Sequence, residues 1–317
     1  MNVLFFGTPD WAVLSLEALA ASSHRVVATV TAPDAPSRRS RTPQPPPVKV
    51  AAERLGLGPI LQPATLRGDA VREQLLAFAP DALAVVAYGR ILPGRLLDAP
   101  PLGGVNLHFS LLPRHRGASP VQHTLWAGDA LAGVTTMRME RGLDTGPTYF
   151  RSAVPVEPDE DAVALGARLA RLGGPLLVET LDRLAAGGVV PEPQDPAQAS
   201  WAPPLTRAMG VVDWNGDAAE IARRVRAFVP WPPVVARGAK GALRLLRATA
   251  LGETAPPGVV PGAVLRRAGD AIDVVCGEGL LRIVELQPEG GRPMTAAAAL
   301  AGRHVELGGR LERWAGP

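Results

Sequence analysis

Three polar residues alternate along the stretch VNLHFSLLPRHRGASP, residues 105–120, which is otherwise apolar up to its turn. In an extended strand every second residue shares a face, so Asn106, His108 and Ser110 are predicted to point the same way. Pro113 and the basic, Gly-containing loop after it mark the exit of this strand. An amide and an imidazole at a strand exit could both donate hydrogen bonds to an oxygen that becomes negatively charged during a reaction.

A carboxylate is predicted to join them. The stretch ERGLDTG places Asp144 in a Gly-flanked loop 36 residues after His108, after one helix and one strand, so the loop could return beside the exit of the first strand. Asn106, His108 and Asp144 would then supply what acyl transfer to an amine needs, with no nucleophilic Ser or Cys. Each residue alone has a plainer reading. N-x-H also suits a structurally bonded histidine at a sheet margin, and Asp144 also suits a turn residue that caps its own loop.

The elements around these residues predict an α/β domain with a mostly parallel sheet. Continuous apolar runs alternate with stretches of helical spacing, which is typical of parallel strands covered on both faces. Ligands bind such sheets at the carboxyl ends of the strands. Strands are expected at 3–7, 25–32, 59–63, 81–89, 103–112, 132–140 and 147–156, and helices at 8–22, 48–57, 69–80 and 119–128. Residues 159–186 predict one long helix or two short ones.

The last third of the chain predicts a second domain. Residues 189–205 are rich in Pro and show no periodicity, which favours a linker between a domain at 1–188 and another at 206–317. The short apolar runs after it, separated by Gly and Pro, indicate a small β barrel. This part holds 15 of the 33 Lys and Arg but only 11 of the 30 Asp and Glu. The excess mildly favours a polyanionic partner, although the preference for Arg over Lys also suits a genome of biased composition.

Several classes of protein are disfavoured. No apolar run reaches the roughly 20 residues that span a bilayer, and the N-terminal stretch does not resemble a signal peptide, so we expect a cytoplasmic protein without membrane association. Cys276 is the single cysteine and is expected to be a buried thiol, which excludes a disulfide framework. GTPDW after the first strand is not G-x-G-x-x-G, so a dinucleotide site has weak support. The histidines lack metal-ligand spacing, so no metal site is predicted.

Six segments resemble the methionyl-tRNA formyltransferase family in content and order across essentially the full length. They are FFGTPDWAV, VKVAAERLGL, VVAYGRILP, NLHFSLLPRHRGASPVQHTLWAGD, GVTTMRMERGLDTGP and RAFVPWP. The resemblance implies a Rossmann-like formyltransferase domain at 1–188, a linker, and an OB-fold-like β barrel at 206–317 that binds tRNA. It implies transfer of the formyl group of 10-formyltetrahydrofolate to the amino group of methionyl-initiator-tRNA for translation initiation. We expect a monomer.

The resemblance also implies roles for individual residues. Asn106, His108 and Asp144 look like the catalytic trio. The folate site would be lined by Ser110, Leu111, Leu112 and Pro113, and by the segment 85–92, whose backbone would hold the pterin ring through Tyr88, Gly89, Arg90, Ile91 and Leu92. Arg38, Arg39 and Arg41 occupy the place of the loop that reaches the tRNA acceptor end, where they could neutralise phosphates. Three Arg among Pro and Ser also suit a solvated loop.

The sequence departs from the family pattern in three places. Phe109 stands where the family usually has Gly, and its side chain should point to the opposite face from His108, so packing behind the strand must differ. Pro147 and Thr148 follow the LDTG loop where an acidic and an apolar residue are common. The Arg-rich segment 34–42 is richer in Pro and lacks the usual Gly and Lys.

Two other classes of formyltransferase, which use different formyl acceptors, would need the same three catalytic residues. A glycinamide ribonucleotide formyltransferase resembles only the first 200 residues or so, which leaves the basic C-terminal part unexplained. A sugar-nucleotide N-formyltransferase would want a nucleotide pocket or an attached dehydrogenase domain, and neither is visible in the sequence. A catalytically silent folate- or RNA-binding module is disfavoured because all three catalytic positions are retained.

Overall fold

The protein is described by a computed structural model that covers residues 1–37 and 40–316. Its internal contacts divide the chain into two compact units. Unit 1 comprises Met1–Pro120, Leu131–Pro155 and Gly166–Pro203, and unit 2 comprises Val121–Ala130, Val156–Leu165 and Pro204–Pro317. The domain and linker limits predicted at residues 188 and 205 stay predictions.

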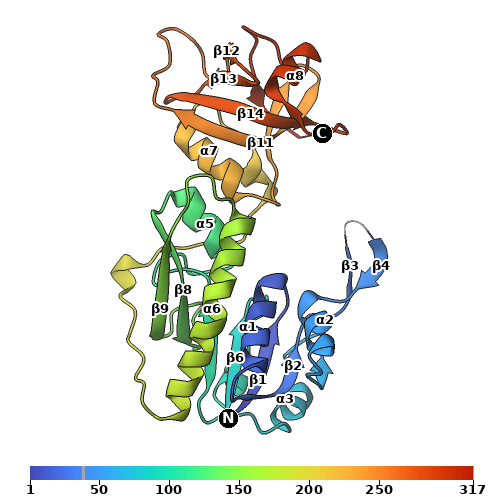
Figure 1. Ribbon diagram of the computed structural model, residues 1–317, viewed down its shortest axis with the longest axis vertical. Coiled ribbons are helices and arrows are strands. Elements are labelled where there is room, and N and C mark those ends of the chain that lie inside the picture. The colour runs from blue at the N-terminus through green and yellow to red at the C-terminus, as the bar shows by residue number, and fades with distance from the viewer. Residues whose placement is uncertain (38–39, 317) are drawn as a thin grey trace. The chain divides into compact units, whose positions relative to one another are not determined.

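Unit 1 is built on one seven-stranded sheet with the order β5-β2-β1-β6-β7-β8-β9 (Figure 1). The strands are β1 (Asn2–Gly7), β2 (Arg25–Val30), β5 (Ile60–Leu61), β6 (Ala82–Val86), β7 (Gly104–His108), β8 (Leu131–Arg138) and β9 (Thr148–Pro155). The first five pair in parallel and the last two are antiparallel. The prediction of a mostly parallel α/β sheet is therefore confirmed.

Helices cover both faces of this sheet. They are α1 (Asp10–Ala20), α2 (Pro47–Arg54), α3 (Asp69–Leu76), α4 (Gly94–Leu97) and α6 (Ala162–Ala185). A further helix, α5 (Pro120–Ala127), falls almost wholly within unit 2. Leu4 and Phe6 of β1 are fully buried in a cluster with Leu75 of α3 and Leu96 of α4. On the other face α6 lies beside α1, with Gly174 against the backbone of Leu14 (Figure 1). Of the two predictions for residues 159–186, the single long helix is the observed one.

The Arg-rich segment contains a hairpin instead of the expected loop. β3 (Ala35–Ser37) and β4 (Ser40–Gln44) pair antiparallel as a separate two-stranded sheet. Lys49 and Gln62 both donate hydrogen bonds to Asp34 at its base, at 2.7–2.9 Å, and these bonds hold the pKa of Asp34 below its ordinary value. Arg38 and Arg39 lie outside the described residues, and of Arg41 only its place in β4 is described.

Unit 2 contains a second, antiparallel sheet with the order β12-β13-β14-β11-β10-β16, and β15 pairs with β14 (Figure 1). Its strands are β10 (Val234–Gly238), β11 (Gly241–Leu251), β12 (Val264–Ala268), β13 (Ala271–Val275), β14 (Leu280–Pro288), β15 (Met294–Thr295) and β16 (Glu312–Arg313). Two helices accompany them, α7 (Ala218–Ala227) and α8 (Ala296–Ala301), and a short 3-10 turn lies at Arg207–Gly210. Another 3-10 turn, at Pro196–Gln198, belongs to unit 1.

The C-terminal segment joins the two edges of this sheet. Gly308 and Val264 are linked by a 3.0 Å backbone hydrogen bond, and Leu311 donates to Gly262 at 2.8 Å, which attaches the segment to the start of β12. β16, which begins at the residue after Leu311, pairs with β10 at the opposite edge. The result is an antiparallel half-barrel with both edges bridged, and the predicted OB-fold-like barrel class is confirmed.

The predicted buried position of Cys276 is confirmed. Cys276 is buried at the end of the barrel core, and burial raises the pKa of its thiol to about 12, which keeps it protonated and unreactive at neutral pH. Within residues 1–37 and 40–316, no helix combines the length and the apolar character that crossing a bilayer requires.

A buried carboxylate ties three strands of the barrel together. Asp273 of β13 is fully buried and stands in register between Arg266 of β12 and Arg282 of β14. It accepts hydrogen bonds from both guanidinium groups at 2.7–2.9 Å. Burial by itself raises the pKa of Asp273, but the two arginines outweigh it and the net pKa lies below the ordinary value.

Replacing Asp273 with Asn should lower the thermal unfolding midpoint at pH 7, because Arg266 and Arg282 lose a buried carboxylate partner, although Arg266 keeps its ion pair with Glu253. We expect a cost of roughly 1–3 kcal/mol. The native carboxylate has a depressed pKa, so its contribution is complete above the unfolded-state value of about 3.9 and disappears as the pH falls through the folded-state value. The difference in unfolding midpoint between the parent and the Asp273→Asn variant should therefore become smaller below pH 4. Asp270→Asn, at an exposed turn position, is the matched control. A difference in midpoint that stays constant from pH 7 to pH 3 would contradict the conclusion that the ionised Asp273 carboxylate stabilises the barrel.

Candidate active site

Strand β7 delivers the first two predicted residues. It lies between β6 and β8, with Asn106 beside Val85 and His108 beside Thr135. Strand alternation puts Asn106 and His108 on one face. The Asn106 side chain is half-buried, and its amide takes part in no hydrogen bond among the residues that the structure describes. It is therefore available to a ligand.

The strand is shorter than predicted, and this corrects the placement of Ser110. β7 ends at His108, and residues 109–115 form a bend and a turn. The Thr135 hydroxyl donates to the Ser110 carbonyl at 2.7 Å and accepts from the Leu112 amide at 3.1 Å, while Ser110 Oγ donates to the Arg114 carbonyl at 2.6 Å. Because β7 ends at His108, strand alternation no longer assigns Ser110 to the face of Asn106 and His108.

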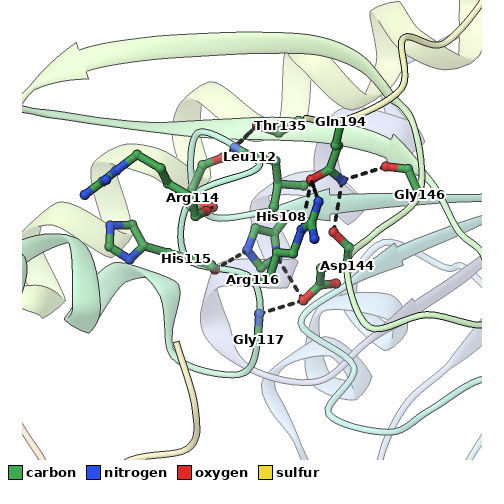
Figure 2. Close-up of polar contacts among 11 residues, drawn as sticks. His108, Leu112, Arg114, His115, Arg116, Gly117, Thr135, Asp144, Gly146 and Gln194 are labelled. Carbon is green, nitrogen blue, oxygen red and sulfur yellow. Dashed lines mark hydrogen bonds and ion pairs between the residues drawn. The ribbon is translucent and has the colours of Figure 1, made fainter. Parts of the chain in front are cut away.

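The structure brings His108 and Asp144 together (Figure 2). His108 Nδ1 lies 3.7 Å from Asp144 Oδ2, and the imidazole is buried with 5% exposure. The other ring nitrogen, Nε2, lies 2.9 Å from the His115 carbonyl. Since a carbonyl only accepts, Nε2 carries a proton, and the Nδ1 edge faces the carboxylate. A charged imidazole would be stabilised from both sides.

The loop between β8 and β9 holds Asp144 in a set orientation. The φ angle of Asp144 is +50°, a left-handed conformation that residues other than Gly rarely adopt. Asp144 Oδ2 accepts a hydrogen bond from the Gly117 amide at 2.8 Å, which ties the carboxylate to the turn after β7. Gly146 passes so close to the Arg138 carbonyl that a Cβ there would collide with it. The course of the loop therefore depends on Gly at this position.

The residues predicted to line a folate site fall into two groups. Ser110 and Leu112 are buried inside the turn, and Leu111 packs against Gly133 of β8, whereas Pro113 is half-buried. These four residues lie in the bend and turn that follow His108 in the chain.

The residues predicted to hold the pterin, 88–92 after β6, also include both buried and exposed members. Tyr88 and Leu92 belong to the core cluster, where burial raises the pKa of the Tyr88 phenol. Gly89, Arg90 and Ile91 are exposed, Ile91 with 86% of its surface. The Arg90 guanidinium donates to the Pro63 and Ala64 carbonyls at 2.7 and 2.8 Å, which fixes the segment to the neighbouring loop.

Phe109 has a clear packing partner on the reverse face. Its ring stacks on Trp11 of α1, with centroids 5.6 Å apart and planes 30° apart. Gly166 of α6 makes room for the Trp11 indole, since a Cβ there would overlap the ring. Phe109 therefore points away from His108, as expected, and the aromatic pair fills the space behind the strand.

Sequence reasoning missed four contributors to the site. They are the His115 carbonyl, the Gly117 amide, and the side chains of Arg116 and Gln194. His115 is 5% exposed, and its carbonyl oxygen lies 2.9 Å from His108 Nε2. Two of the four are backbone groups, which leave no signature in residue type. Gln194 lies in the stretch predicted as a linker.

The described residues contain no group of three or more His, Cys, Asp and Glu side chains that could hold a metal ion. The site residues that the structure brings together offer an imidazole, a carboxylate and backbone dipoles, and the amide of Asn106 lies on the same strand.

Fold and site together define a formyl transferase. The family described as formyl transferase matches residues 1–181, and the family described as formyl transferase, C-terminal domain, matches residues 204–304. Among solved structures, HypX from Aquifex aeolicus in complex with tetrahydrofolic acid aligns with a TM-score of 0.60 and 17% identity over 97% of this chain, which spans about half (48%) of HypX. An N-formyltransferase from Helicobacter canadensis, in complex with folinic acid and dTDP-3-aminofucose, aligns over 89% of this chain and 97% of its own, with a TM-score of 0.62 and 15% identity. These similarities show the fold alone.

The sequence relatives are more specific. The methionyl-tRNA formyltransferase of Halorhodospira halophila is 46% identical over 307 residues, which cover 97% of this chain and 98% of the relative. That of Citrifermentans bemidjiense is 42% identical over 311 residues, covering 98% and 96%. The chain belongs to the methionyl-tRNA formyltransferase family.

Gly146→Ala should displace the Asp144 loop, because the added methyl group cannot coexist with the Arg138 carbonyl. We expect formyl transfer to fall by about 10² or more, since a misplacement of about 1 Å at a catalytic group can cost this much. Gly252→Ala, at an exposed position of unit 2 with nothing within 4 Å of the new Cβ, is the control. Steady-state rates of both purified variants provide the comparison, and parent-like turnover by Gly146→Ala would show that the loop tolerates the shift.

Proposed function

We propose that this protein transfers the formyl group of 10-formyltetrahydrofolate to the amino group of methionyl-initiator-tRNA, with Asn106, His108 and Asp144 as the catalytic residues. The observation that carries the proposal is the 3.7 Å approach of His108 to Asp144 at the carboxyl end of β7, in a chain of this family. The N-formylmethionyl-tRNA formed would serve translation initiation, which also argues for a cytoplasmic enzyme.

The amine attacks the formyl carbon directly in this mechanism. Its nitrogen forms the new C–N bond, the carbonyl oxygen gains negative charge, and the bond to the folate nitrogen then breaks as the amine proton passes to that nitrogen. The Asn106 amide and the Nδ1–H of the charged His108 ring donate hydrogen bonds to the oxyanion, while the Nε2–H stays bonded to the His115 carbonyl. Asp144 stabilises the charge on His108 and receives the amine proton through water on its way to the leaving nitrogen.

The folate would lie along the carboxyl ends of β6 and β7. Gly89, Arg90 and Ile91 fit this role because they are exposed, and the backbone of Arg90 and Ile91 makes no hydrogen bond among the described residues. Their amide and carbonyl groups could pair with the pterin edge while Ile91 covers one of its faces. Ser110, Leu111, Leu112 and Pro113 would border the opposite side.

The tRNA would be bound by basic residues of both parts of the chain. Arg38, Arg39 and Arg41 belong to the segment of the β3–β4 hairpin, and the C-terminal part carries an excess of Arg over acidic residues. Contacts of these residues with phosphates would weaken as the salt concentration rises. We further propose that the enzyme acts as a monomer, because Asn106, His108 and Asp144 all come from one chain.

Other formyl acceptors receive less support. Glycinamide ribonucleotide transformylase 1 of Symbiobacterium toebii aligns with only 62% of this chain, which leaves the half-barrel without a role. The sugar N-formyltransferases share the fold at 14–15% identity, far below the 42–46% shared with the methionyl-tRNA formyltransferases. A catalytically silent binding module would not need His108 and Asp144 in contact.

The acceptor is tested by incubating the purified protein with 10-formyltetrahydrofolate and either methionyl-initiator-tRNA, glycinamide ribonucleotide or a dTDP-amino sugar. We expect formylation of the tRNA at a rate far above that of either small acceptor. Formylation of a small acceptor but not of the tRNA would overturn the proposal, and transfer to none of the three would favour a silent module.

His108→Ala should lower kcat by about 10²–10³, because the lost donor acts on charge that forms only during the reaction. The KM values for folate and tRNA should change little. His108→Gln keeps a hydrogen-bond donor of similar reach and should retain more activity than the Ala variant. Thermal unfolding of both variants checks that the fold is preserved. Turnover of the Ala variant within a few fold of the parent would remove His108 from the mechanism.

A further inference from the structure

The segment 192–202 makes a series of hydrogen bonds with the two loops that carry the site. On one side Glu192 and Thr148 exchange two backbone hydrogen bonds of 2.8 Å. On the other side Arg116 donates to the Ser200 carbonyl at 2.9 Å and accepts from the Ala202 amide at 2.7 Å. This part of the predicted linker is thus bonded both to the start of β9 and to the turn after β7.

A single side chain of this segment connects the two loops directly. The Gln194 Nε2 group donates to the Asp144 carbonyl at 2.9 Å and to the Gly146 carbonyl at 2.6 Å (Figure 2). Its Oε1 accepts from Arg116 Nε and Nη2 at 3.0 and 2.8 Å. Gln194 and Arg116 are both more than nine-tenths buried. All four donor and acceptor positions of the carboxamide are thereby directed at residues of the site loops.

We propose that Gln194 is a positioning residue for formyl transfer, whose carboxamide, oriented by Arg116, fixes the Asp144 carboxylate beside His108. This inference rests on the proposed role of Asp144. It assigns a function in the reaction to a residue that lies outside both matched family regions, which end at 181 and resume at 204.

The conformation of Asp144 explains why such a residue is needed. Its left-handed φ is one that an L-residue with a side chain rarely keeps without outside support. The two carbonyls bound by Gln194 flank the turn that places Asp144 Oδ2 within 3.7 Å of His108. Without this donor the loop can relax, and the carboxylate then loses its fixed relation to the imidazole.

The neighbouring turn is adapted to the same segment. Gly117 donates the hydrogen bond to Asp144, and its φ is +125°. A Cβ on Gly117 would stand 2.6 Å from the Ala202 carbonyl. Because Gly117 has no side chain, the segment 200–202 can approach this turn closely. The same turn orients the Asp144 carboxylate through the Gly117 amide.

Gln194→Glu is the sharpest test, because it keeps the size of the side chain and its acceptor for Arg116 but removes the donor to Asp144 and Gly146. We expect kcat to fall at least tenfold, with the KM values for folate and tRNA within about twofold of the parent, since a displaced catalytic group affects the reaction step. The control is Gln198→Ala in the same segment, whose exposed side chain bonds only to Asp195 among the described residues. It should leave kcat unchanged. A kcat of Gln194→Glu within twofold of the parent would overturn the proposal.

A double-mutant cycle separates positioning from general stability. If Gln194 acts through Asp144, adding Gln194→Ala to an Asp144→Asn background should reduce single-turnover formylation by less than twofold, although the same change in the parent reduces it at least tenfold. If Gln194 only supports the fold, the two losses will multiply, and this outcome would refute the inference. Thermal unfolding of each variant establishes that the rates belong to folded protein.

The two proposals fail in different ways. The proposed function fails if the parent enzyme does not formylate methionyl-initiator-tRNA. The positioning role is judged by ratios of variant to parent rates with whichever acceptor the parent uses, so it can fail while the function stands.

Discussion

The site depends on keeping a carboxylate beside a buried imidazole. Taking charged groups out of water is costly unless hydrogen bonds and an opposite charge compensate. Here the His108 ring has the His115 carbonyl on one nitrogen and Asp144 near the other, and the Asp144 carboxylate has the Gly117 amide. Two of these three partners are backbone groups. The chemistry therefore requires the backbone of two loops to be fixed, and not only the right side chains.

The fold supplies that rigidity from several directions. β7 lies inside the sheet between β6 and β8, so the start of the site is part of the core. Behind it the stacked rings of Phe109 and Trp11 fill the opposite face. The segment 192–202 then bonds to the turn after β7 and to the start of β9. A segment that was predicted to be only a linker thus helps to build the site of unit 1.

Much of this arrangement could be predicted from sequence. The parallel strands are continuous apolar runs, and the alternation of Asn106 and His108 fixes their common face. Asp144 was expected to return beside the end of the first strand, and it lies 3.7 Å from His108, although β8 runs antiparallel to β7 and the loop reaches this position without a parallel crossover. The family resemblance supplied the substrates, which composition and spacing could not.

The errors have a common physical origin. β7 was expected to run to Leu112, but side-chain hydrogen bonds from Thr135 and Ser110 fold the chain after His108, and such tertiary bonds are invisible to periodicity. The Arg-rich segment was expected as a loop, although β3 and β4 pair in spite of Pro36 and Pro43. Gln194 resembles any polar residue of a Pro-rich linker, and its role follows only from the carbonyls that it contacts in three dimensions.

The account can be tested most directly by a crystal structure of the protein with a hydrolysis-resistant analogue of 10-formyltetrahydrofolate. We expect the formyl oxygen within about 2.7–3.1 Å of the Asn106 amide nitrogen, with the Nδ1 edge of His108 on the same side of the formyl group. A formyl group bound away from both residues, with the pterin elsewhere than along Gly89 to Ile91, would contradict the proposed site.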